Sequence, residues 1–263
     1  SVKNLKKIYS KQHNGKTYAL NDLNLDVKEG EIFGLLGPNG AGKTTFINIL
    51  AGTVIKTGGE VNVCGFNLDE NPRQVRASVG VVPQEINLDP FFSPRKLLDL
   101  QAGLYGVKEK DRITDTILNL VSLEKEANSY ARSLSGGMKR RLLMAKALVH
   151  QPPLVFLDEP TAGVDVELRQ NLWKNVRMLN KLGVTIILTT HYLEEAEEMC
   201  DRIAILNKGN IVALDSTKNL LNRIQTKKVT FKTDRIIDIK DEEINSLKII
   251  SKIDTEICVS YEK

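Results

Sequence analysis

Residues 37–44 read Gly-Pro-Asn-Gly-Ala-Gly-Lys-Thr, a full match to the phosphate-binding pattern G-x-x-x-x-G-K-[ST]. The short apolar run 32–36 precedes this loop, and residues 44–50 have the pattern of a helix. A strand, a glycine-rich loop and a helix in this order direct backbone N–H groups and the positive end of a helix dipole at an anion. Lys43 adds a charge for phosphate oxygens, and the Thr44 hydroxyl is placed to bind Mg²⁺. The loop therefore predicts a nucleotide phosphate site.

Two adjacent carboxylates follow a second apolar run. Residues 154–160 read Leu-Val-Phe-Leu-Asp-Glu-Pro, so Asp158 ends a predicted strand and Glu159 follows it directly. Asp158 has the position of a carboxylate that holds Mg²⁺ in nucleotide hydrolases, and the alternative is an Asp that caps the next turn. Glu159, beside a γ-phosphate, can orient an attacking water and accept its proton. Together with the glycine-rich loop, this pair predicts nucleotide hydrolysis.

A second anion-binding turn is predicted at residues 134–138, which read Leu-Ser-Gly-Gly-Met. Ser135 is expected to cap a helix that runs to about Val149, with the N–H groups of Gly136 and Gly137 exposed at its start. One nucleotide does not need two phosphate cradles in one chain. Two chains that face each other head to tail do need them, because each cradle can complete the partner's site.

These three elements, in this order, resemble those of the ATP-binding subunit of an ABC transporter, and the resemblance covers residues 1–220. Gln84 resembles the Q-loop glutamine that senses Mg²⁺ and the membrane subunit, with an ordinary loop amide as the alternative. Asp165 resembles the D-loop aspartate that crosses the dimer interface. His191 resembles the switch histidine on the γ-phosphate, with a strand-end histidine bonded to backbone as the alternative.

An aromatic residue that stacks on adenine is also expected from the resemblance. Tyr9 lies near the position where the family carries it, and Tyr18 is the competing candidate. The resemblance implies that Glu159, His191 and Gln84 are catalytic and that Thr44, Gln84 and Asp158 bind Mg²⁺. The residues expected to contact ATP are Tyr9, Gly37, Pro38, Asn39, Gly40, Ala41, Gly42, Lys43, Thr44, Thr45, Ser135, Gly136, Gly137 and Asp165.

Strand-like and helical segments alternate along the chain, which argues for an α/β fold with a mainly helical insertion. The resemblance specifies a P-loop NTPase (RecA-like) core with an N-terminal antiparallel β subdomain and a helical signature subdomain. We expect the ATP-binding domain over residues 1–223, its helical subdomain over about 93–150, and a small C-terminal appendage over 224–263 that is shorter than many family tails. Strands are predicted at residues 32–36, 155–157, 184–188, 203–206 and 211–214, the last two as a hairpin around Lys208-Gly209.

The resemblance implies a subunit that hydrolyses ATP with Mg²⁺ and powers transport through separate membrane subunits, by closure and reopening of a head-to-tail homodimer. Residues 104–107 and 189–197 resemble those of ABC-2-type exporter ATPases, which favours export. An importer ATPase is the closer alternative. A soluble ABC ATPase acting on ribosomes or nucleic acid is the second, and a single phosphate loop and a net charge of only +4 weigh against it.

The composition is that of an ordinary globular protein, with 41% apolar and 27% charged residues in 263. No apolar run approaches the ~20 residues that cross a bilayer, and no signal peptide begins the chain. Cys64, Cys200 and Cys258 form no C-x-x-C pair, so we expect reduced intracellular thiols. The chain begins at Ser1 without a methionine, which predicts that a few native residues precede it. We expect a cytoplasmic protein held on the membrane's cytoplasmic face by integral permease subunits.

Three further expectations concern surface residues. Phe91 or Phe92 is predicted to contact the membrane subunit, with core packing as the alternative. The basic run 139–141 is expected to be a solvated helix face. His13 and His150 have no supporting pattern and are expected at the surface.

Overall fold

The computed structural model of the protein describes residues 1–10, 16–162, 166–223, 226–232, 247–253 and 256–262. The chain divides into two compact units, Ser1–Thr217 and Lys218–Lys263. The first unit therefore ends slightly before residue 223, where the sequence pattern predicts the boundary. His13 and Asp165 lie outside the described residues.

A six-stranded sheet forms the centre of the first unit, in the order β10-β9-β3-β8-β7-β6. Neighbouring strands are parallel except for the β9–β10 pair. Three of the central strands are buried at every position, as expected when helices cover both faces of a parallel sheet. The strands are β3 (Ile32–Leu36), β6 (Val79–Val82), β7 (Leu154–Asp158), β8 (Thr185–Thr190), β9 (Arg202–Asn207) and β10 (Asn210–Ser216).

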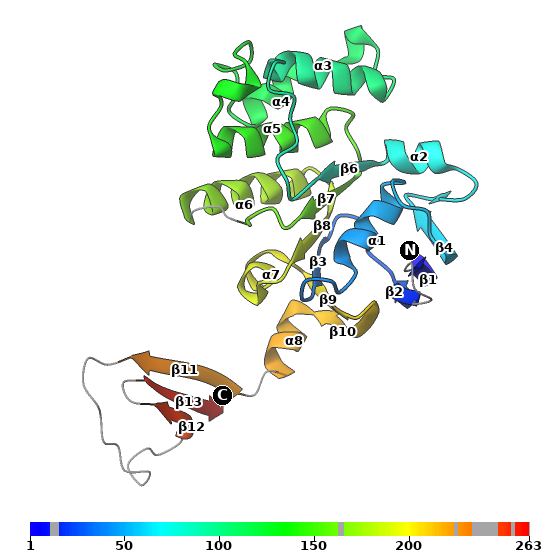
Figure 1. The fold of residues 1–263 in the computed structure, drawn as a ribbon. Coiled ribbons are helices and arrows are strands. Elements are labelled where there is room, and N and C mark those ends of the chain that lie inside the picture. The colour runs from blue at the N-terminus through cyan, green and yellow to red at the C-terminus, as the bar shows by residue number, and fades with distance from the viewer. Residues whose placement is uncertain (11–15, 163–165, 224–225, 233–246, 254–255, 263) are drawn as a thin grey trace. The chain divides into compact units, whose positions relative to one another are not determined.

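Helices lie on both faces of this sheet (Figure 1). Helix α1 (Lys43–Leu50) covers one face, and α6 (Val166–Lys181) and α7 (Leu193–Met199) cover the other. The carboxyl ends of the parallel strands meet at one edge of the sheet, where ligands bind in open α/β folds. The loop after β3 and the residues that follow β6, β7 and β8 therefore come together.

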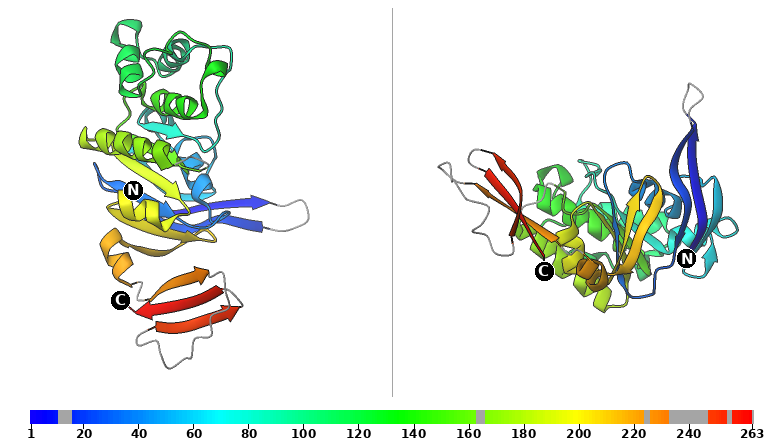
Figure 2. Two further views of the ribbon diagram at one scale, coloured as in Figure 1. Left: turned by 90° about the vertical axis from the view of Figure 1, so that its left-hand side faces the viewer. Right: turned by 90° about the horizontal axis from the view of Figure 1, so that it is seen from below.

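A four-stranded antiparallel sheet, in the order β2-β1-β4-β5, packs beside α1 and shares its core. Its residues Leu5, Leu20 and Val61 belong to the same buried cluster as Phe46 of α1. Strands β1 and β2 extend well beyond this core as a long pair (Figure 2). The strands are β1 (Val2–Ser10), β2 (Lys16–Leu25), β4 (Gly58–Val63) and β5 (Phe66–Asn67).

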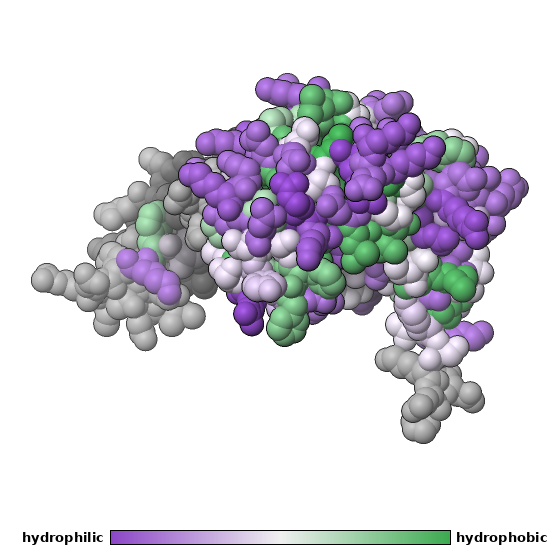
Figure 3. All heavy atoms as spheres, turned by 90° about the horizontal axis from the view of Figure 1, so that it is seen from above, coloured by the Kyte–Doolittle hydropathy of each residue, from purple (hydrophilic) through white to green (hydrophobic). Residues whose placement is uncertain are grey.

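Helices α3, α4 and α5 form a helical part at one end of the unit (Figure 1), which agrees with the predicted helical insertion. The short helix α2 (Pro72–Ala77) precedes β6. Viewed from above, the outer surface of the helical part is mostly hydrophilic, with small hydrophobic patches (Figure 3). Its helices are α3 (Pro94–Leu104), α4 (Thr114–Leu120) and α5 (Gly136–Leu148), with short 3₁₀ turns at Glu109–Asp111 and Ala131–Ser133.

The predicted hairpin near the end of the first unit is confirmed. Lys208 and Gly209 both have positive φ, 47° and 79°, and join β9 to β10. A two-residue turn of this kind matches the twist of paired strands.

The second unit contains three antiparallel strands in the order β11-β13-β12. They are β11 (Thr226–Lys232), β12 (Leu247–Ile253) and β13 (Glu256–Glu262), and α8 (Thr217–Arg223) precedes them. Within the described ranges, no helix is both long enough and apolar enough to cross a bilayer.

The expectation that residues 139–141 form a solvated face is wrong for two of them. Arg140 and Arg141 are half-buried, and each guanidinium donates to two backbone carbonyl oxygens. The sequence could not show this, because the acceptors are main-chain atoms of other segments.

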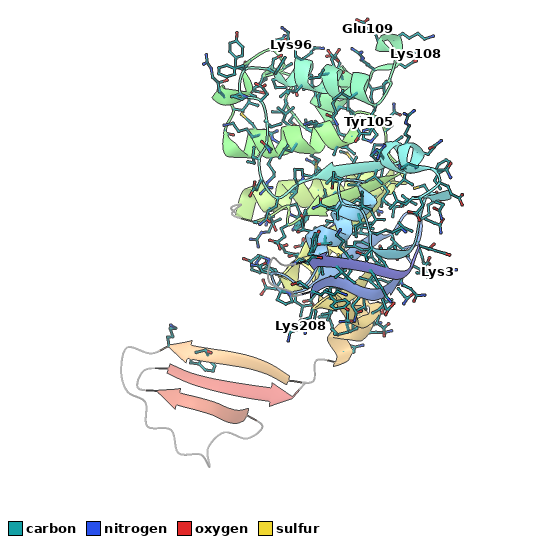
Figure 4. All side chains as sticks on the ribbon, turned by 45° about the vertical axis from the view of Figure 1, so that its right-hand side comes forward. Lys3, Lys96, Tyr105, Lys108, Glu109 and Lys208 are labelled. Atoms are coloured by element: carbon teal, nitrogen blue, oxygen red, sulfur yellow. The ribbon has the colours of Figure 1, made fainter. Side chains whose placement is uncertain are left out.

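The expectation that His150 lies at the surface is also wrong. Its ring stacks on Tyr105 with centroids 3.7 Å apart, and its Nε2 lies 3.1 Å from the Val79 carbonyl oxygen. Figure 4 shows Tyr105 on the inner side of the helical part, whereas Lys96 and Lys108 lie at its outer end. Burial lowers the pKa of His150 below its ordinary value of 6.5.

A pH-dependent loss of stability follows from this lowered pKa. As the pH drops below 6.5, His150 binds a proton in the unfolded chain but stays neutral in the folded chain, because its pKa is lower there. Protonation therefore favours the unfolded chain, and the free energy of unfolding decreases as the pH falls through this value. The melting temperature should therefore decrease less between pH 7.5 and about 5.5 for His150→Phe, which keeps a ring for stacking, than for the wild type. Ile55→Ala, at an exposed position without a titratable side chain, should keep the wild-type slope. Equal slopes for wild type and His150→Phe would contradict this assignment.

Candidate active site

The glycine-rich loop joins β3 to α1 at the carboxyl edge of the sheet. Gly42 has φ 111°, and a Cβ there would lie 2.4 Å from the Ala19 carbonyl oxygen, so only glycine fits without a shift. Gly40 has φ 78°, and a Cβ there would meet nothing within 4 Å. The loop therefore packs tightly against β2 on one side and is open on the other.

Backbone donors of the loop face this open side. In the part of the chain that the structure describes, the N–H groups of Gly40, Gly42, Lys43 and Thr44 donate to no protein acceptor, whereas Ala41 N donates to Pro38 O at 3.1 Å. Consecutive N–H groups at a helix start bind phosphate oxygens well, since the helix dipole also favours negative charge there. This arrangement fits the phosphates of a nucleotide.

Lys43 lies across the mouth of the loop. Its Nζ donates to Gly37 O at 2.6 Å and to Pro38 O at 3.3 Å, and it lies 3.4 Å from Glu159 Oε1. The side chain is buried, so its charge is screened less than that of a surface lysine. Lys43 thus connects the phosphate loop to the acidic pair at the end of β7.

Two of the three residues expected to hold Mg²⁺, Thr44 and Asp158, meet beside the loop, whereas Gln84 bonds Glu159. Thr44 Oγ1 donates to Asp158 Oδ2 at 3.2 Å, and Thr189 Oγ1 donates to Asp158 Oδ1 at 2.6 Å. Within the described ranges, no group of three or more His, Cys, Asp or Glu side chains could hold a metal. Mg²⁺ is commonly held by one or two carboxylates together with substrate phosphates and water. A hydroxyl and a carboxylate next to a phosphate loop fit that ion.

Glu159 is the meeting point of the site. Its Oε2 accepts a hydrogen bond from Gln84 Nε2 at 3.2 Å and lies 3.3 Å from His191 Nδ1, while its Oε1 faces Lys43. Three residues from the ends of three other segments thus surround one buried carboxylate.

The backbone at Glu159 holds this carboxylate in an uncommon conformation. Its φ is 44°, which non-glycine residues rarely adopt. The N–H of Glu159 donates to both the carbonyl oxygen and the Oγ1 of Thr189, each at 3.1 Å, and Glu159 O accepts from Ala162 N at 3.1 Å. Neighbouring groups fix such strained positions, which cluster at functional sites.

The second predicted anion turn forms the start of α5. Ser135 Oγ accepts a hydrogen bond from Met138 N at 3.2 Å, so Ser135 caps the helix as predicted. In the described part of the chain, the N–H groups of Gly136 and Gly137 have no protein acceptor. No described hydrogen bond joins this turn to the loop of residues 37–44.

The two candidate aromatics lie on neighbouring strands. Tyr9 pairs with Thr17 and Ile8 pairs with Tyr18 in the β1–β2 register, and both tyrosines are exposed. Lys7 Nζ lies 4.7 Å from the centroid of the Tyr9 ring. This geometry leaves both aromatics available to a ligand.

A buried carboxylate that no sequence pattern marks supports the site. Glu195 of α7 accepts hydrogen bonds from the hydroxyls of Thr161 and, at 2.7 Å, Thr190, and its Oε1 lies 3.8 Å from Arg169 Nε. Thr161 follows Glu159 by two residues, and Thr190 directly precedes His191. The run of glutamates in this helix gives no sequence signal that distinguishes the buried one.

Comparisons with known proteins agree with this geometry. The sequence profile of the ABC transporter family matches residues 20–162. The Nod factor export ATP-binding protein I of Cupriavidus pinatubonensis (strain JMP 134 / LMG 1197) is 42% identical over 210 residues, which cover 79% of this chain and 65% of that protein. The linearmycin resistance ATP-binding protein LnrL of Bacillus subtilis (strain 168) is 37% identical over 225 residues, which cover 85% of this chain and 71% of that protein. The chain thus spans about two thirds of these relatives' length.

Solved structures show the same fold. An ATP-binding subunit of an ABC transporter superposes with a TM-score of 0.74 at 29% identity, covering 85% of this chain and 92% of that one. A dimeric ATP-binding cassette in a post-hydrolysis state, bound to ADP and Pi, superposes with a TM-score of 0.72 at 29% identity. The match covers 82% of this chain and 97% of that one. The predicted P-loop NTPase fold and the predicted family are confirmed.

Proposed function

Because this chain belongs to the ABC transporter family, we propose that it hydrolyses ATP and thereby powers transport, in the export direction, through separate membrane subunits. The observation that carries the proposal is the Glu159 carboxylate, which lies among Lys43, Gln84 and His191. It lies beside a loop whose N–H groups, among the residues that the structure describes, are largely unpaired. A carboxylate in this position can orient a water and accept its proton.

The proposed division of labour follows the contacts of each side chain. The N–H groups of Gly40, Gly42, Lys43 and Thr44 bind the phosphates together with the Lys43 ammonium, and Tyr9 stacks on adenine. Gln84 and His191 hold the attacking water and the γ-phosphate in line with Glu159. Thr44 and Asp158, with Gln84, would hold Mg²⁺, which would supply positive charge next to the phosphates. Positioning and electrostatics contribute most of the rate in phosphoryl transfer, because the transition state is loose.

A head-to-tail homodimer completes the proposed site. The N–H groups of Gly136 and Gly137, next to Ser135, have no acceptor in the described part of the chain, and no described bond joins this turn to the first loop. Both observations support a role toward a partner chain's γ-phosphate. Asp165 is proposed to cross the same interface. The solved relatives include dimeric cassettes, one of them with ADP and Pi. Binding of ATP then closes the dimer, and hydrolysis reopens it.

The names of two relatives, a Nod factor export protein and a linearmycin resistance protein, favour export as the direction of transport. We also propose that the chain acts at the cytoplasmic face of the membrane and docks on a permease through Phe91 or Phe92. Neither phenylalanine is buried in the core, since Phe91 is 68% and Phe92 38% exposed. An exposed aromatic pair is a common anchor in protein interfaces.

Co-purification tests this proposal. The tagged full chain, recovered from gently solubilised membranes of its native cell, should bring a multi-span membrane protein and no solute-binding protein. A double Phe91→Ala, Phe92→Ala variant should lose that partner, whereas Ile55→Ala, at another exposed apolar position, should keep it. Recovery with a binding protein would overturn export, and recovery with ribosomes or nucleic acid alone would overturn transport.

A further inference from the structure

Arg140 connects the helical part to the candidate site through main-chain atoms. It lies in the second turn of α5, close to the anion turn of residues 135–137. Its Nη1 donates to Gln84 O at 2.8 Å, and its Nη2 donates to Ala162 O at 3.1 Å. One side chain of the helical part thus holds two loops, one after β6 and the other after β7.

These contacts close a hydrogen-bonded ring that includes Glu159. Arg140 donates to Gln84 O, and the Gln84 side chain donates to the Glu159 carboxylate at 3.2 Å. Ala162 N donates to Glu159 O at 3.1 Å, and Ala162 O accepts the second bond from Arg140, which closes the ring. Because the planar guanidinium presents its donors in a rigid fork, it fixes the separation between its two acceptors. A displacement of α5 would therefore move both Gln84 and the turn that carries Glu159.

The charge of Arg140 also fits a positioning role. In the described part of the chain, no carboxylate forms an ion pair with Arg140, and burial lowers the pKa of its guanidinium. A half-buried charge that is compensated only by carbonyl oxygens is costly for stability alone.

The neighbouring Arg141 provides an internal comparison. It too donates to two carbonyl oxygens, Val121 O at 2.8 Å and Ser122 O at 2.9 Å. Both acceptors belong to the helical part, directly after α4. Arg140 and Arg141 thus make equivalent bonds from one helix, and only the first reaches the candidate site.

We propose that Arg140 is a positioning residue that couples the anion turn at the start of α5 to the Gln84–Glu159 pair. The proposal rests on the proposed function, because the coupling matters only if Glu159 activates water. When α5 engages a phosphate of the partner's nucleotide, Arg140 sets the position of Gln84 and of the turn at residues 159–162.

The test compares Arg140→Ala, Arg140→Lys and Arg141→Ala in the full chain. We expect Arg140→Ala to lower kcat roughly ten- to a hundredfold, because small displacements of reacting groups have effects of this size. Its affinity for ATP and its KM should change by no more than about twofold, since the phosphate loop is untouched. Arg140→Lys keeps the charge but has a single donor nitrogen in place of the fork, and should recover part of kcat. Arg141→Ala should lower the melting temperature with kcat near that of the wild type.

A double variant gives a second, independent readout. If Arg140 acts through Glu159, Arg140→Ala added to Glu159→Gln should lower kcat no further than Glu159→Gln alone, as expected for residues that act as a unit. Multiplicative effects would overturn the proposal, as would equal kcat values for Arg140→Ala and Arg141→Ala. Absence of ATPase activity in the wild type would instead overturn the proposed function. If Arg140→Ala does not fold, Arg140→Lys and its double variant decide the question.

Discussion

Glu159→Gln is expected to lower the turnover of ATP by roughly 10²- to 10⁴-fold, the range for loss of a general base. The amide keeps the shape of the side chain and can still meet Gln84, but it cannot accept a proton from water. Its backbone position is retained, because glutamine has the same conformational preferences as glutamate at the φ of 44°. Binding of ATP should remain, since the phosphate loop and Lys43 are intact.

The variant should therefore accumulate as an ATP-bound dimer, which size-exclusion chromatography with Mg²⁺ and ATP would detect. Single-turnover measurements would show whether the hydrolysis step itself is slowed. Glu197→Gln, an exposed glutamate on α7, is the matched control and should behave as the wild type. Normal hydrolysis by Glu159→Gln would show that another group activates the water.

Glu195→Ala is expected to destabilise the first unit and to reduce activity at the same time. The substitution leaves the buried hydroxyls of Thr161 and Thr190 without their acceptor. Each buried polar group left unpaired costs about 1–3 kcal/mol, which corresponds to several degrees in melting temperature for a unit of this size. Thr161 follows Glu159 by two residues, and Thr190 directly precedes His191. Displacement of either threonine should therefore also slow hydrolysis.

Thermal unfolding and steady-state ATPase measurements would check both effects. Glu195→Gln keeps one of the two acceptor oxygens and should recover part of the stability. Glu194→Ala removes an exposed neighbour on the same helix and should change neither quantity. If Glu195→Ala unfolds at the wild-type temperature, the hydroxyl contacts do not contribute to stability.

Much of the site could be predicted because its motifs are contiguous. The glycine loop, the acidic pair and the Ser135 cap each follow from residue types over a few positions. The convergence of the glycine loop and the acidic pair followed from the parallel strands, whose carboxyl ends share one edge. The run 32–36 was predicted with the bounds that β3 has.

The remaining features depend on contacts that local patterns do not encode. Arg140 reaches Gln84 across 56 positions, and His150 reaches Val79 across 71. In both cases the acceptor is a backbone carbonyl, which every residue carries, so no residue type marks the partner. The strands of the second unit were missed for a different reason. Their apolar residues come in short pairs such as Ile249-Ile250 between charges, and this hides the period-2 pattern of a strand.

The strand order has a consequence for biosynthesis. Strand β3 pairs with β8 and β9, which are translated long after it, while β7 and β6 join the sheet only through β8. A nascent chain that ends before Thr185 therefore has a fully apolar β3 with neither of its neighbours. Unpaired strands of this kind are prone to aggregate. The phosphate loop is thus among the first functional parts to leave the ribosome and among the last to be held in place.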